Sequence, residues 1–169
     1  MNSKGKCFTA VTAFAAMFGL SAHAHADGHE GMNVPTIKSS AVMTGLENPW
    51  DMAFLPDGTM FFTEKCKGLS VRTKDGSVNA LYGMEDTSGY SDAGSDLFCE
   101  GQAGMLGVVA DINFAKNRTL YVYSTSTKYH GSGCKTNFEK CDGNIVMSFK
   151  VSDDLKSVSD RTDIVTDIQ

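Results

Sequence analysis

The feature that most constrains the fold is a series of short apolar strands separated by turns, which occurs twice along the chain. The first unit contains four expected strands, at residues 50–55, 59–63, 68–73 and 77–82. Pro56-Asp57-Gly58 and Asp75-Gly76 are its expected turns. These residues favour turns because proline presets φ, aspartate bonds back to the main chain and glycine adopts positive φ. The second unit contains four more, at residues 105–110, 119–124, 144–151 and 162–168. This pattern predicts an all-β chain with two four-stranded antiparallel sheets.

Repeated sheets of this kind are the blades of β-propellers. A closed propeller ring contains roughly four to eight blades. Two blades therefore predict either the assembly of several chains into one ring or, more economically, that the blades belong to a longer protein. A β-sandwich built from the same strands is the alternative fold.

The first 26 residues have the three parts of a secretory signal. Lys4 and Lys6 form a basic head, residues 7–20 are nearly uncharged and apolar, and Ala24-His25-Ala26 is a small-x-small cleavage site. The apolar part is shorter than the roughly 20 residues that a membrane-spanning helix needs. A short buried helix is the alternative. We expect a cleaved signal peptide at 1–26, a flexible leader at 27–36 and propeller blades at 37–169, in a protein that is periplasmic or secreted.

The chain carries a net charge of −5 at pH 7, and 41% of its residues are hydrophobic. That hydrophobic share is typical of a globular protein rather than a disordered one. The excess of acidic over basic residues excludes a basic surface that could follow nucleic-acid phosphates. We therefore expect no nucleic-acid partner, and no membrane span once the signal is cleaved.

Cleavage of the signal removes Cys7 and leaves four cysteines: Cys66, Cys99, Cys134 and Cys141. An even number in an oxidising compartment favours two disulfides. The sequence leaves every pairing open, and we expect the local one, Cys66–Cys99 with Cys134–Cys141. A metal site is the alternative, but no two of these cysteines have the spacing that is typical of zinc ligands.

Four segments in order carry a family resemblance. Residues 45–58 read GLENPWDMAFLPDG, residues 63–65 TEK, residues 101–108 GQAGMLGV and residues 114–122 FAKNRTLYV. They resemble the opening blade, the T-E-R/K strand end, the G-Q-x-G-L-L-G segment and the F-x-x-N-x-x-x-Y-V run of one family. That family is the soluble pyrroloquinoline-quinone (PQQ)-dependent sugar dehydrogenases, or glucose/sorbosone dehydrogenases. The chain resembles their N-terminal portion.

The resemblance implies a six-bladed propeller in which PQQ lies over the central channel, helped by a bound Ca²⁺. It implies hydride transfer from the anomeric carbon of a sugar to the quinone, and an electron acceptor such as a periplasmic cytochrome c or a quinone. Gln102 matches the family glutamine that faces the sugar pocket. Its amide offers a donor and an acceptor to a sugar hydroxyl. The alternative is that Gln102 only satisfies backbone groups of its own loop.

The chain also departs from the family pattern. The catalytic histidine of the family belongs to an Asp-His pair in a later blade, and neither His29 nor His130 matches it. The family's H-P-D-F block reads Asp111-Ile112-Asn113-Phe114 here. We therefore expect no catalytic residue in this chain, most ligands of PQQ and Ca²⁺ beyond residue 169, and activity only in the full-length enzyme. The alternative functions are a non-catalytic propeller-type module that binds a ligand or protein, and a propeller hydrolase of the lactonase type.

Three further motifs carry separate hypotheses. The first is a possible Ca²⁺ site in an acidic loop, at Glu85, Asp86, Asp92, Asp96 and Glu100. Cleavage after Ala26 would expose Asp27-Gly28-His29, whose nitrogens can surround Cu²⁺ or Ni²⁺, and the alternative is a leader without a ligand. Asn117-Arg118-Thr119 fits the N-glycosylation pattern, which we interpret as a chance match within a turn.

Overall fold

The computed structural model of the chain describes residues 35–129 and 143–168. The expected signal peptide, most of the leader, and His29, His130, Cys134 and Cys141 lie outside these residues. The chain divides into two units, Met1–Ser40 and Ala41–Gln169, and every strand and helix named below lies in the second. Within the described residues, no helix is long and apolar enough to cross a membrane.

The first unit of the sequence pattern forms a five-stranded sheet. Its strands pair in chain order and are β1 (Pro49–Phe54), β2 (Met60–Glu64), β3 (Gly68–Arg72), β4 (Val78–Met84) and β5 (Asp92–Gly94). The first four strands are antiparallel and match the four expected ones, whereas β5 is a short parallel addition to β4 that the pattern did not predict.

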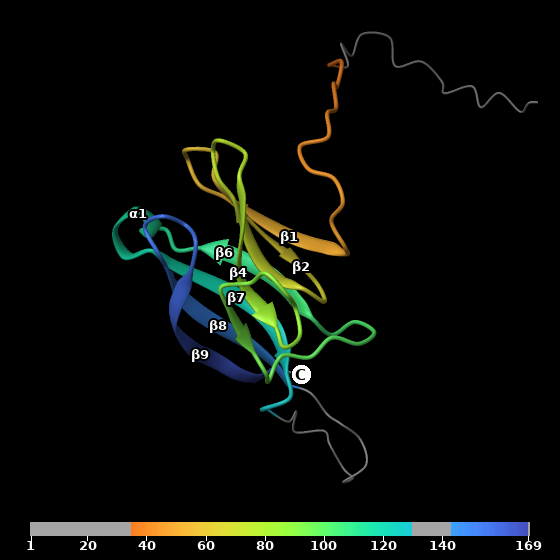
Figure 1. Ribbon diagram of the computed structural model, residues 1–169, viewed down its shortest axis with the longest axis vertical. Coiled ribbons are helices and arrows are strands. Elements are labelled where there is room, and N and C mark those ends of the chain that lie inside the picture. Colours follow the sequence, from red (N-terminus) through yellow and green to blue (C-terminus); the bar gives the residue numbers. More distant parts are fainter. Residues whose placement is uncertain (1–34, 130–142, 169) are drawn as a thin grey trace, which may run out of the picture. The chain divides into compact units, whose positions relative to one another are not determined.

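The second unit forms a four-stranded antiparallel sheet (Figure 1). Its strands, again in chain order, are β6 (Met105–Ala110), β7 (Thr119–Ser126), β8 (Gly143–Val151) and β9 (Val158–Ile168). The connection between β6 and β7 contains one short helix, α1 (Phe114–Asn117). The final strand begins at Val158 instead of residue 162, because pairs such as Val158 with Val151 extend its register with β8.

The predicted turns have the geometry that their residues favour. Gly58 has a φ of +87°, and its N–H donates to the Leu55 carbonyl at 3.0 Å. The Asp57 carboxylate accepts a bond from the Thr59 N–H at 3.0 Å. Gly76, in the turn between β3 and β4, has a φ of +92°. Turn chemistry therefore sets the strand boundaries of the first sheet.

The hydrophobic core lies between the two sheets. The first sheet contributes fully buried side chains that include Phe61, Leu69, Val71 and Leu81, and the second contributes Leu120, Val122, Ile145, Met147 and Phe149. Phe61 packs edge-on against Phe114 of α1 with ring centroids 5.4 Å apart, which joins β2 to the second sheet. These alternating buried positions explain why the period-two pattern of the sequence predicted the strands.

Two polar side chains also join the sheets where β1 and β2 meet β6. One carboxylate oxygen of Asp51 accepts a hydrogen bond from the Val108 N–H at 2.9 Å. The Thr63 hydroxyl donates to the Leu106 carbonyl at 2.5 Å. The register of β6 against β7 shifts between Met105 and Val108. Side chains of the first sheet thus form hydrogen bonds with backbone groups of β6 at the point where the pairing of β6 with β7 is irregular.

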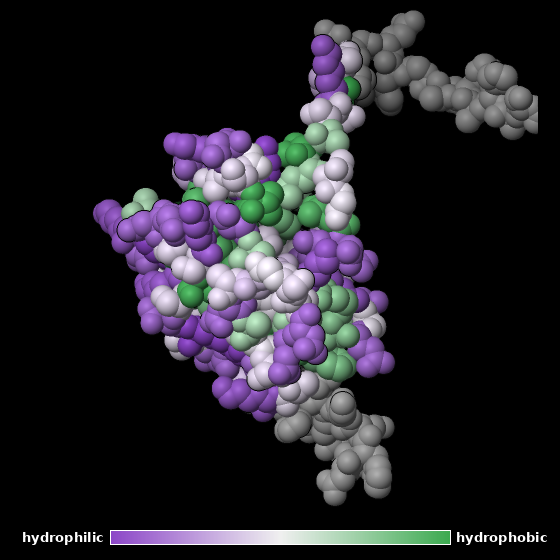
Figure 2. Space-filling model, viewed as in Figure 1, coloured by the Kyte–Doolittle hydropathy of each residue, from purple (hydrophilic) through white to green (hydrophobic). Residues whose placement is uncertain are grey.

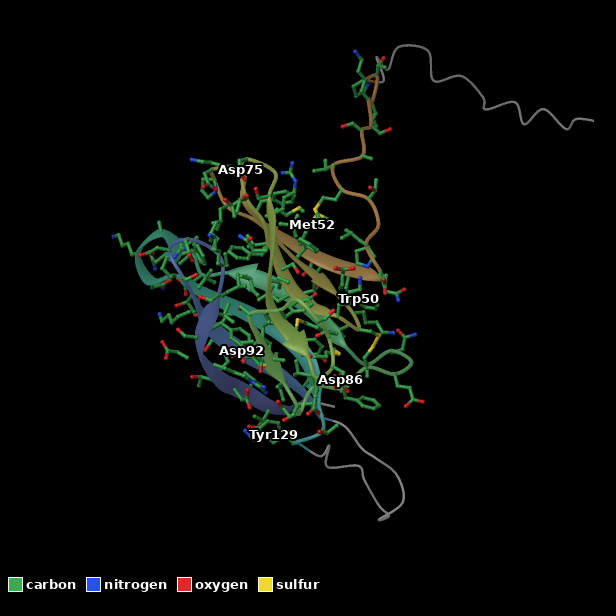
Figure 3. All side chains as sticks on the ribbon, viewed as in Figure 1. Trp50, Met52, Asp75, Asp86, Asp92 and Tyr129 are labelled. Carbon is green, nitrogen blue, oxygen red and sulfur yellow. A yellow bond between two sulfur atoms is a disulfide. The ribbon has the colours of Figure 1, made fainter. Side chains whose placement is uncertain are left out.

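On β1, the side chains that face away from the core are apolar and exposed to solvent. Trp50, Met52 and Phe54 on β1 expose 50%, 58% and 64% of their surface, and Figure 3 labels the first two of them. Figure 2 shows hydrophobic residues on the surface around β1 and the segment that leads into it. Exposed apolar area on this scale marks a surface that is suited to contact with other protein.

The connections between strands gather at the two ends of the sheets. The β2–β3 turn and the segment that leads into β6 lie at one end, since Lys65 bonds to Met105 there. The β1–β2 turn and α1 lie at the other end, where Pro56 and Phe114 line one groove. We call these the β2–β3 end and the α1 end. Gln102 belongs to the β2–β3 end.

Candidate functional site

Gln102 lies at the tip of a tight turn between β5 and β6. The Ala103 N–H donates to the Glu100 carbonyl at 2.8 Å and closes this turn. Gly101 precedes Gln102 with a φ of +55°, a conformation that glycine adopts without strain. The Gln102 side chain is exposed, and within residues 35–129 and 143–168 its amide has no hydrogen-bond partner. Both its donor and its acceptor are therefore available to a ligand.

The backbone that follows Gln102 is fixed by β7 and by the β2–β3 turn. The Gly104 N–H donates to the Thr125 hydroxyl at 3.2 Å, and its carbonyl accepts from the Ser124 hydroxyl at 3.1 Å. The Met105 N–H donates to the Lys65 carbonyl at 2.8 Å. Gly104 has a φ of +152°, and a Cβ there would lie 2.6 Å from the Lys65 carbonyl oxygen. Only glycine fits this close approach.

The backbone that precedes Gln102 is anchored to the end of β7. The Thr127 N–H donates to the Asp96 carbonyl at 2.7 Å, and the Phe98 N–H donates to the Thr125 carbonyl at 3.2 Å. Leu97 forms an isolated bridge with Ser126. Anchors on both sides leave only residues 99–103 free of the sheet, so the loop around Gln102 is short and constrained.

A disulfide joins this loop to the β2–β3 turn. Cys99 bonds to Cys66, with their Cα atoms 5.4 Å apart. This bond confirms the predicted local pairing of these two cysteines. The other predicted pair, Cys134 and Cys141, lies outside the described residues. The covalent link places Gln102 within a few residues of a cross-link between two connections at the β2–β3 end.

A polar network that the sequence did not reveal holds the base of the loop. Arg161 on β9 donates to both carboxylate oxygens of Asp96 at 2.6 Å, and to the Tyr82 hydroxyl at 2.8 Å. Its Nε donates to Asp163 at 2.9 Å, and the Tyr129 hydroxyl donates to the other Asp163 oxygen at 2.9 Å. The network joins β4, the loop and β9, so it ties the two sheets together at one point.

The network keeps its charges at neutral pH. Burial raises the pKa of the Asp96 carboxyl, but hydrogen bonds from Arg161 and Ser126 and the charge of Arg161 outweigh it, so the net pKa lies below its ordinary value. Burial likewise raises the pKa of Asp163, and bonds from Tyr129 and Arg161 bring it below the ordinary value. The pKa of Arg161 is raised, since its bonds to Asp96 and Tyr82 outweigh its burial. The network is therefore an ion cluster.

The acidic loop does not form the Ca²⁺ site that its carboxylates suggested. Among the described residues, no group of three or more histidine, cysteine, aspartate or glutamate side chains could hold a metal ion. Asp96 is committed to Arg161 and Ser126, and Asp92 accepts a bond from the Ala93 N–H. Figure 3 shows Asp86 and Asp92 well separated. These carboxylates do not converge as Ca²⁺ ligands must.

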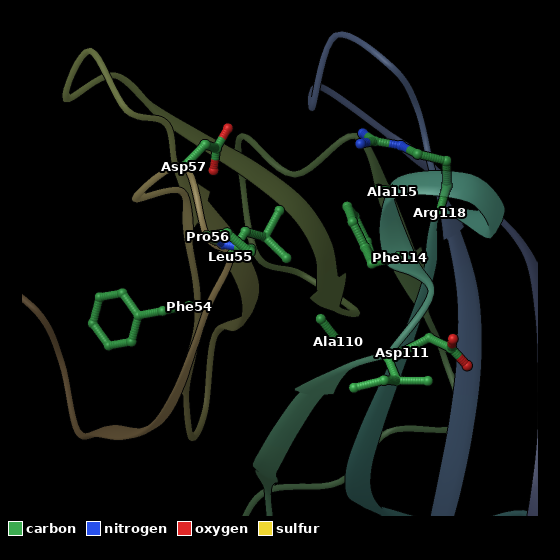
Figure 4. A pocket seen from close by; sticks show the side chains of 10 residues that line it. Phe54, Leu55, Pro56, Asp57, Ala110, Asp111, Phe114, Ala115 and Arg118 are labelled. Carbon is green, nitrogen blue, oxygen red and sulfur yellow. The ribbon is translucent and has the colours of Figure 1, made fainter.

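A groove lies at the α1 end, away from Gln102. It has a volume of about 550 Å³ and is lined by both polar and apolar side chains, among them Phe54, Asp57, Ile112, Phe114 and Arg118. Figure 4 shows Asp57 and Arg118 on opposite sides of it. Arg118 is already bonded to the Ser152 carbonyl at 2.6 Å and lies over the Phe114 ring. The groove therefore has a structural cation rather than a free one.

The glycosylation pattern begins at the last residue of α1, and its middle residue, Arg118, lines this groove. The Asn117 amide donates to Asp111 at 2.9 Å, and its oxygen accepts from the Thr119 N–H at 3.0 Å. Arg118 adopts a left-handed φ of +57° as the cap of α1. Asn117 thus serves the local turn, and the interpretation of the pattern as a chance match stays a prediction.

Comparisons with known proteins point to one family. The model of the glucose / sorbosone dehydrogenase family matches residues 46–169. The uncharacterised protein slr1608 of Synechocystis sp. is 37% identical over 99 residues, which are 57% of this chain and 23% of that protein. The aldose sugar dehydrogenase YliI of Escherichia coli is 25% identical over 125 residues, which are 74% of this chain and 29% of that protein.

Solved structures show the same likeness. A crystal structure of a glucose dehydrogenase matches with a TM-score of 0.57 and 25% identity, covering 75% of this chain and 32% of the other. The soluble aldose sugar dehydrogenase of Escherichia coli in its apo form matches with a TM-score of 0.52 and 25% identity, covering 72% and 30%. The PQQ-bound aldose sugar dehydrogenase of Streptomyces coelicolor, at 17% identity, matches with a TM-score of 0.55, covering 75% and 32%.

The likeness confirms the predicted fold of β-propeller blades. The chain spans about a quarter of the length of the curated relatives and about a third of the solved structures. Two sheets are therefore two blades of the kind that these dehydrogenases contain, and they do not close a ring by themselves.

The basic side chains around the Gln102 loop do not fit PQQ, whose carboxylates require free cations. Lys65 donates to the Gly101 carbonyl, Arg161 to Asp96, and Lys128 to Asp163. Each of these cations therefore already has a partner within the described residues. These side chains therefore offer no site for the quinone, and the exposed Gln102 amide is the feature that suits a ligand.

Proposed function

The chain belongs to the glucose/sorbosone dehydrogenase family, and on that premise we propose that it is the N-terminal part of an exported, PQQ-dependent dehydrogenase that oxidises an aldose or sorbosone-like sugar. The relatives' greater length supports a role as one part of a larger propeller. When bound, PQQ would accept the hydride that leaves the sugar. The base and the cofactor ligands come from blades other than these two.

The observation that carries the proposal is the presentation of Gln102. The side chain is exposed at the tip of a turn whose backbone is fixed on both sides by Thr125 and Lys65. A sugar hydroxyl both donates and accepts, and an amide can satisfy both functions at once. A rigid loop also reduces the conformational entropy that is lost when the ligand binds. Gln102 is therefore suited to orient a sugar, and the chemistry is left to other groups.

The cellular setting follows from the same proposal. The signal-like residues 1–26 support export, and the Cys66–Cys99 disulfide is stable in an oxidising compartment. We place the protein in the periplasm or outside the cell, with Ca²⁺ as a second cofactor of the whole propeller. The electrons would pass to a periplasmic cytochrome c or a quinone.

The test uses the full-length protein loaded with PQQ and Ca²⁺, with dye reduction followed in the presence of several aldoses. We expect dye reduction that depends on both PQQ and the sugar. Gln102→Ala should raise KM about fivefold to tenfold, the usual loss for one or two hydrogen bonds to a ligand. Asn113→Ala is the matched control, because that amide is exposed at the α1 end and makes no cap bond.

Two outcomes would contradict the proposed enzyme, and a third would contradict only the role of Gln102. Sugar binding without any dye reduction would favour the non-catalytic binding module instead. Hydrolysis of lactones without sugar oxidation would favour the lactonase-like alternative. Equal KM values for Gln102→Ala and Asn113→Ala would leave the dehydrogenase intact but would remove Gln102 from the sugar site.

A further inference from the structure

Lys65 and Cys66 are neighbours in the β2–β3 turn, and each holds the Gln102 loop at a different point. The Lys65 ammonium donates to the carbonyl of Gly101, the residue directly before Gln102. The Lys65 carbonyl accepts from the N–H of Met105, after Gln102. Cys66 holds Cys99 on the incoming side through the disulfide. Two consecutive residues therefore hold the Gln102 loop at three points, Cys99, Gly101 and Met105.

The platform that carries these two residues is itself rigid. Every residue of β2 is buried, and Lys65 directly follows this strand. The Lys65 N–H donates to the Asn48 carbonyl at 3.0 Å, and the Lys67 N–H closes the turn onto the Glu64 carbonyl at 3.0 Å. A side chain that extends from such a rigid segment can hold the loop that it contacts in a fixed position relative to the core.

The loop has little else to hold its tip. Asp96 to Phe98 pair with β7, and Gly104 bonds to Thr125, but residues 99–103 lie between these anchors. Within this stretch, the described hydrogen bond from outside the loop is that of the Lys65 ammonium to Gly101, and Cys99 is held by the disulfide and packs against the core. The Gln102 amide makes no bond of its own within the described residues. Its position therefore depends on Lys65 and the disulfide in addition to the anchors at Phe98 and Gly104.

We propose that Lys65 is a positioning residue for sugar binding, which acts through the Gly101 carbonyl and together with the Cys66–Cys99 disulfide to hold the Gln102 amide in its ligand-facing position. This role rests on the proposed function, in which Gln102 contacts the sugar. Lys65 itself touches neither the sugar nor the reacting atoms. An arginine at this position keeps a cationic donor of similar reach, whereas methionine keeps only the apolar stem.

The experiment compares Lys65→Met, Lys65→Arg and the control Lys116→Met in the full-length protein loaded with PQQ and Ca²⁺. Lys116 is an exposed lysine on α1, at the other end of the sheets. We expect Lys65→Met to raise KM for an aldose about fivefold with kcat within about twofold, since the lost bond affects ground-state binding. Lys65→Arg should restore KM to within about twofold of the wild type, and Lys116→Met should leave it unchanged.

A double-mutant cycle separates positioning from general weakening of the fold. In a Gln102→Ala background, Lys65→Met should cause no further rise in KM, because the group that it positions is already absent. Amide hydrogen exchange over residues 99–104 provides a readout without turnover, and Lys65→Met should accelerate it about tenfold. Paired Cys66→Ser and Cys99→Ser substitutions should accelerate the same amides.

The outcomes distinguish this inference from the proposed function. If the wild type oxidises aldoses but the KM effects of Lys65→Met and Gln102→Ala simply multiply, or exchange over 99–104 is unchanged, the positioning role is overturned alone. If the loaded wild type oxidises no aldose, the proposed function fails, and the role of Lys65 toward a sugar fails with it.

Discussion

Replacement of Asp96 by asparagine should lower the free energy of unfolding by about 2–3 kcal/mol at pH 7. Asp96 accepts two bonds from Arg161 at 2.6 Å and one from Ser126 at 2.8 Å. Both charged side chains are only 20% exposed. Removal of one partner from a fully buried ion pair costs about 3–5 kcal/mol. The expected loss is smaller here because some solvent reaches the pair and Arg161 keeps its bond to Asp163.

The matched control is Asp153→Asn, which makes the same chemical change in another arginine–aspartate pair. The Asp153 side chain is fully exposed and lies 3.6 Å from Arg118. Exposed pairs of this kind contribute about 0–1 kcal/mol. Urea denaturation of the full-length protein, followed by circular dichroism, should therefore show a clear shift for Asp96→Asn and a slight one for Asp153→Asn.

The effect of Asp96→Asn should also depend on pH. The pKa of Asp96 in the folded protein lies below the ordinary value of 3.8, because the bonds from Arg161 and Ser126 outweigh its burial. A carboxyl whose pKa is lower in the folded than in the unfolded protein stabilises the fold at any pH above its unfolded pKa. This contribution is lost as the pH falls through the pKa of the folded protein. The gap between wild type and variant should therefore narrow below about pH 4. Equal losses for both variants at pH 7, or a gap that is constant from pH 7 to pH 3, would show that the charge of Asp96 does not stabilise the fold.

Three further predictions concern the core, the loop and its cross-link. Phe61→Ala should reduce the free energy of unfolding by about 3–5 kcal/mol in urea denaturation, because the ring is fully buried against Phe114; a loss below about 1 kcal/mol would contradict the core assignment. Gly104→Ala should lower the free energy of unfolding by about 2–3 kcal/mol, since its Cβ would lie 2.5 Å from Lys65 Cγ. Gly89→Ala, at a φ of +89° with open space around it, should lower it by about 1 kcal/mol in the same assay. Equal costs would remove the close approach as the cause. Joint replacement of Cys66 and Cys99 by serine should cost about 3–4 kcal/mol, because the bond closes a loop with a sequence separation of 33; an unchanged thermal midpoint would contradict this.

The sequence predicted most of the strands because local chemistry sets them. Turns such as Pro56-Asp57-Gly58 have residue-specific backbone geometry, and alternating apolar residues mark the buried side of each strand. The short strand β5 (Asp92–Gly94) was missed, because three residues contain no alternation and its parallel pairing with β4 is a tertiary contact. The start of β9 was missed for a related reason: Ser159 to Arg161 read as polar loop residues, and Asp160 has a φ of +53°.

The candidate site divides in the same way. Cys66 and Cys99 were paired correctly, because cysteine parity and local pairing are visible in a sequence. The Arg161 network was missed, since Tyr82, Asp96 and Arg161 are far apart in the chain and each alone resembles a surface residue. Gln102 was selected by its resemblance to a family segment, and its contact with a sugar stays a prediction. The anchoring by Lys65 depends on two loops meeting in space, which no local pattern reveals.

We propose that these two blades belong to an enzyme that passes electrons from a sugar to bound PQQ. The most direct measurement is an anaerobic titration of the full-length, PQQ-loaded protein with an aldose, followed through the absorption of the bound quinone. We expect the quinone to be reduced, with one sugar oxidised for each quinone bound. An unchanged quinone spectrum with every aldose, in protein shown to hold PQQ, would contradict it.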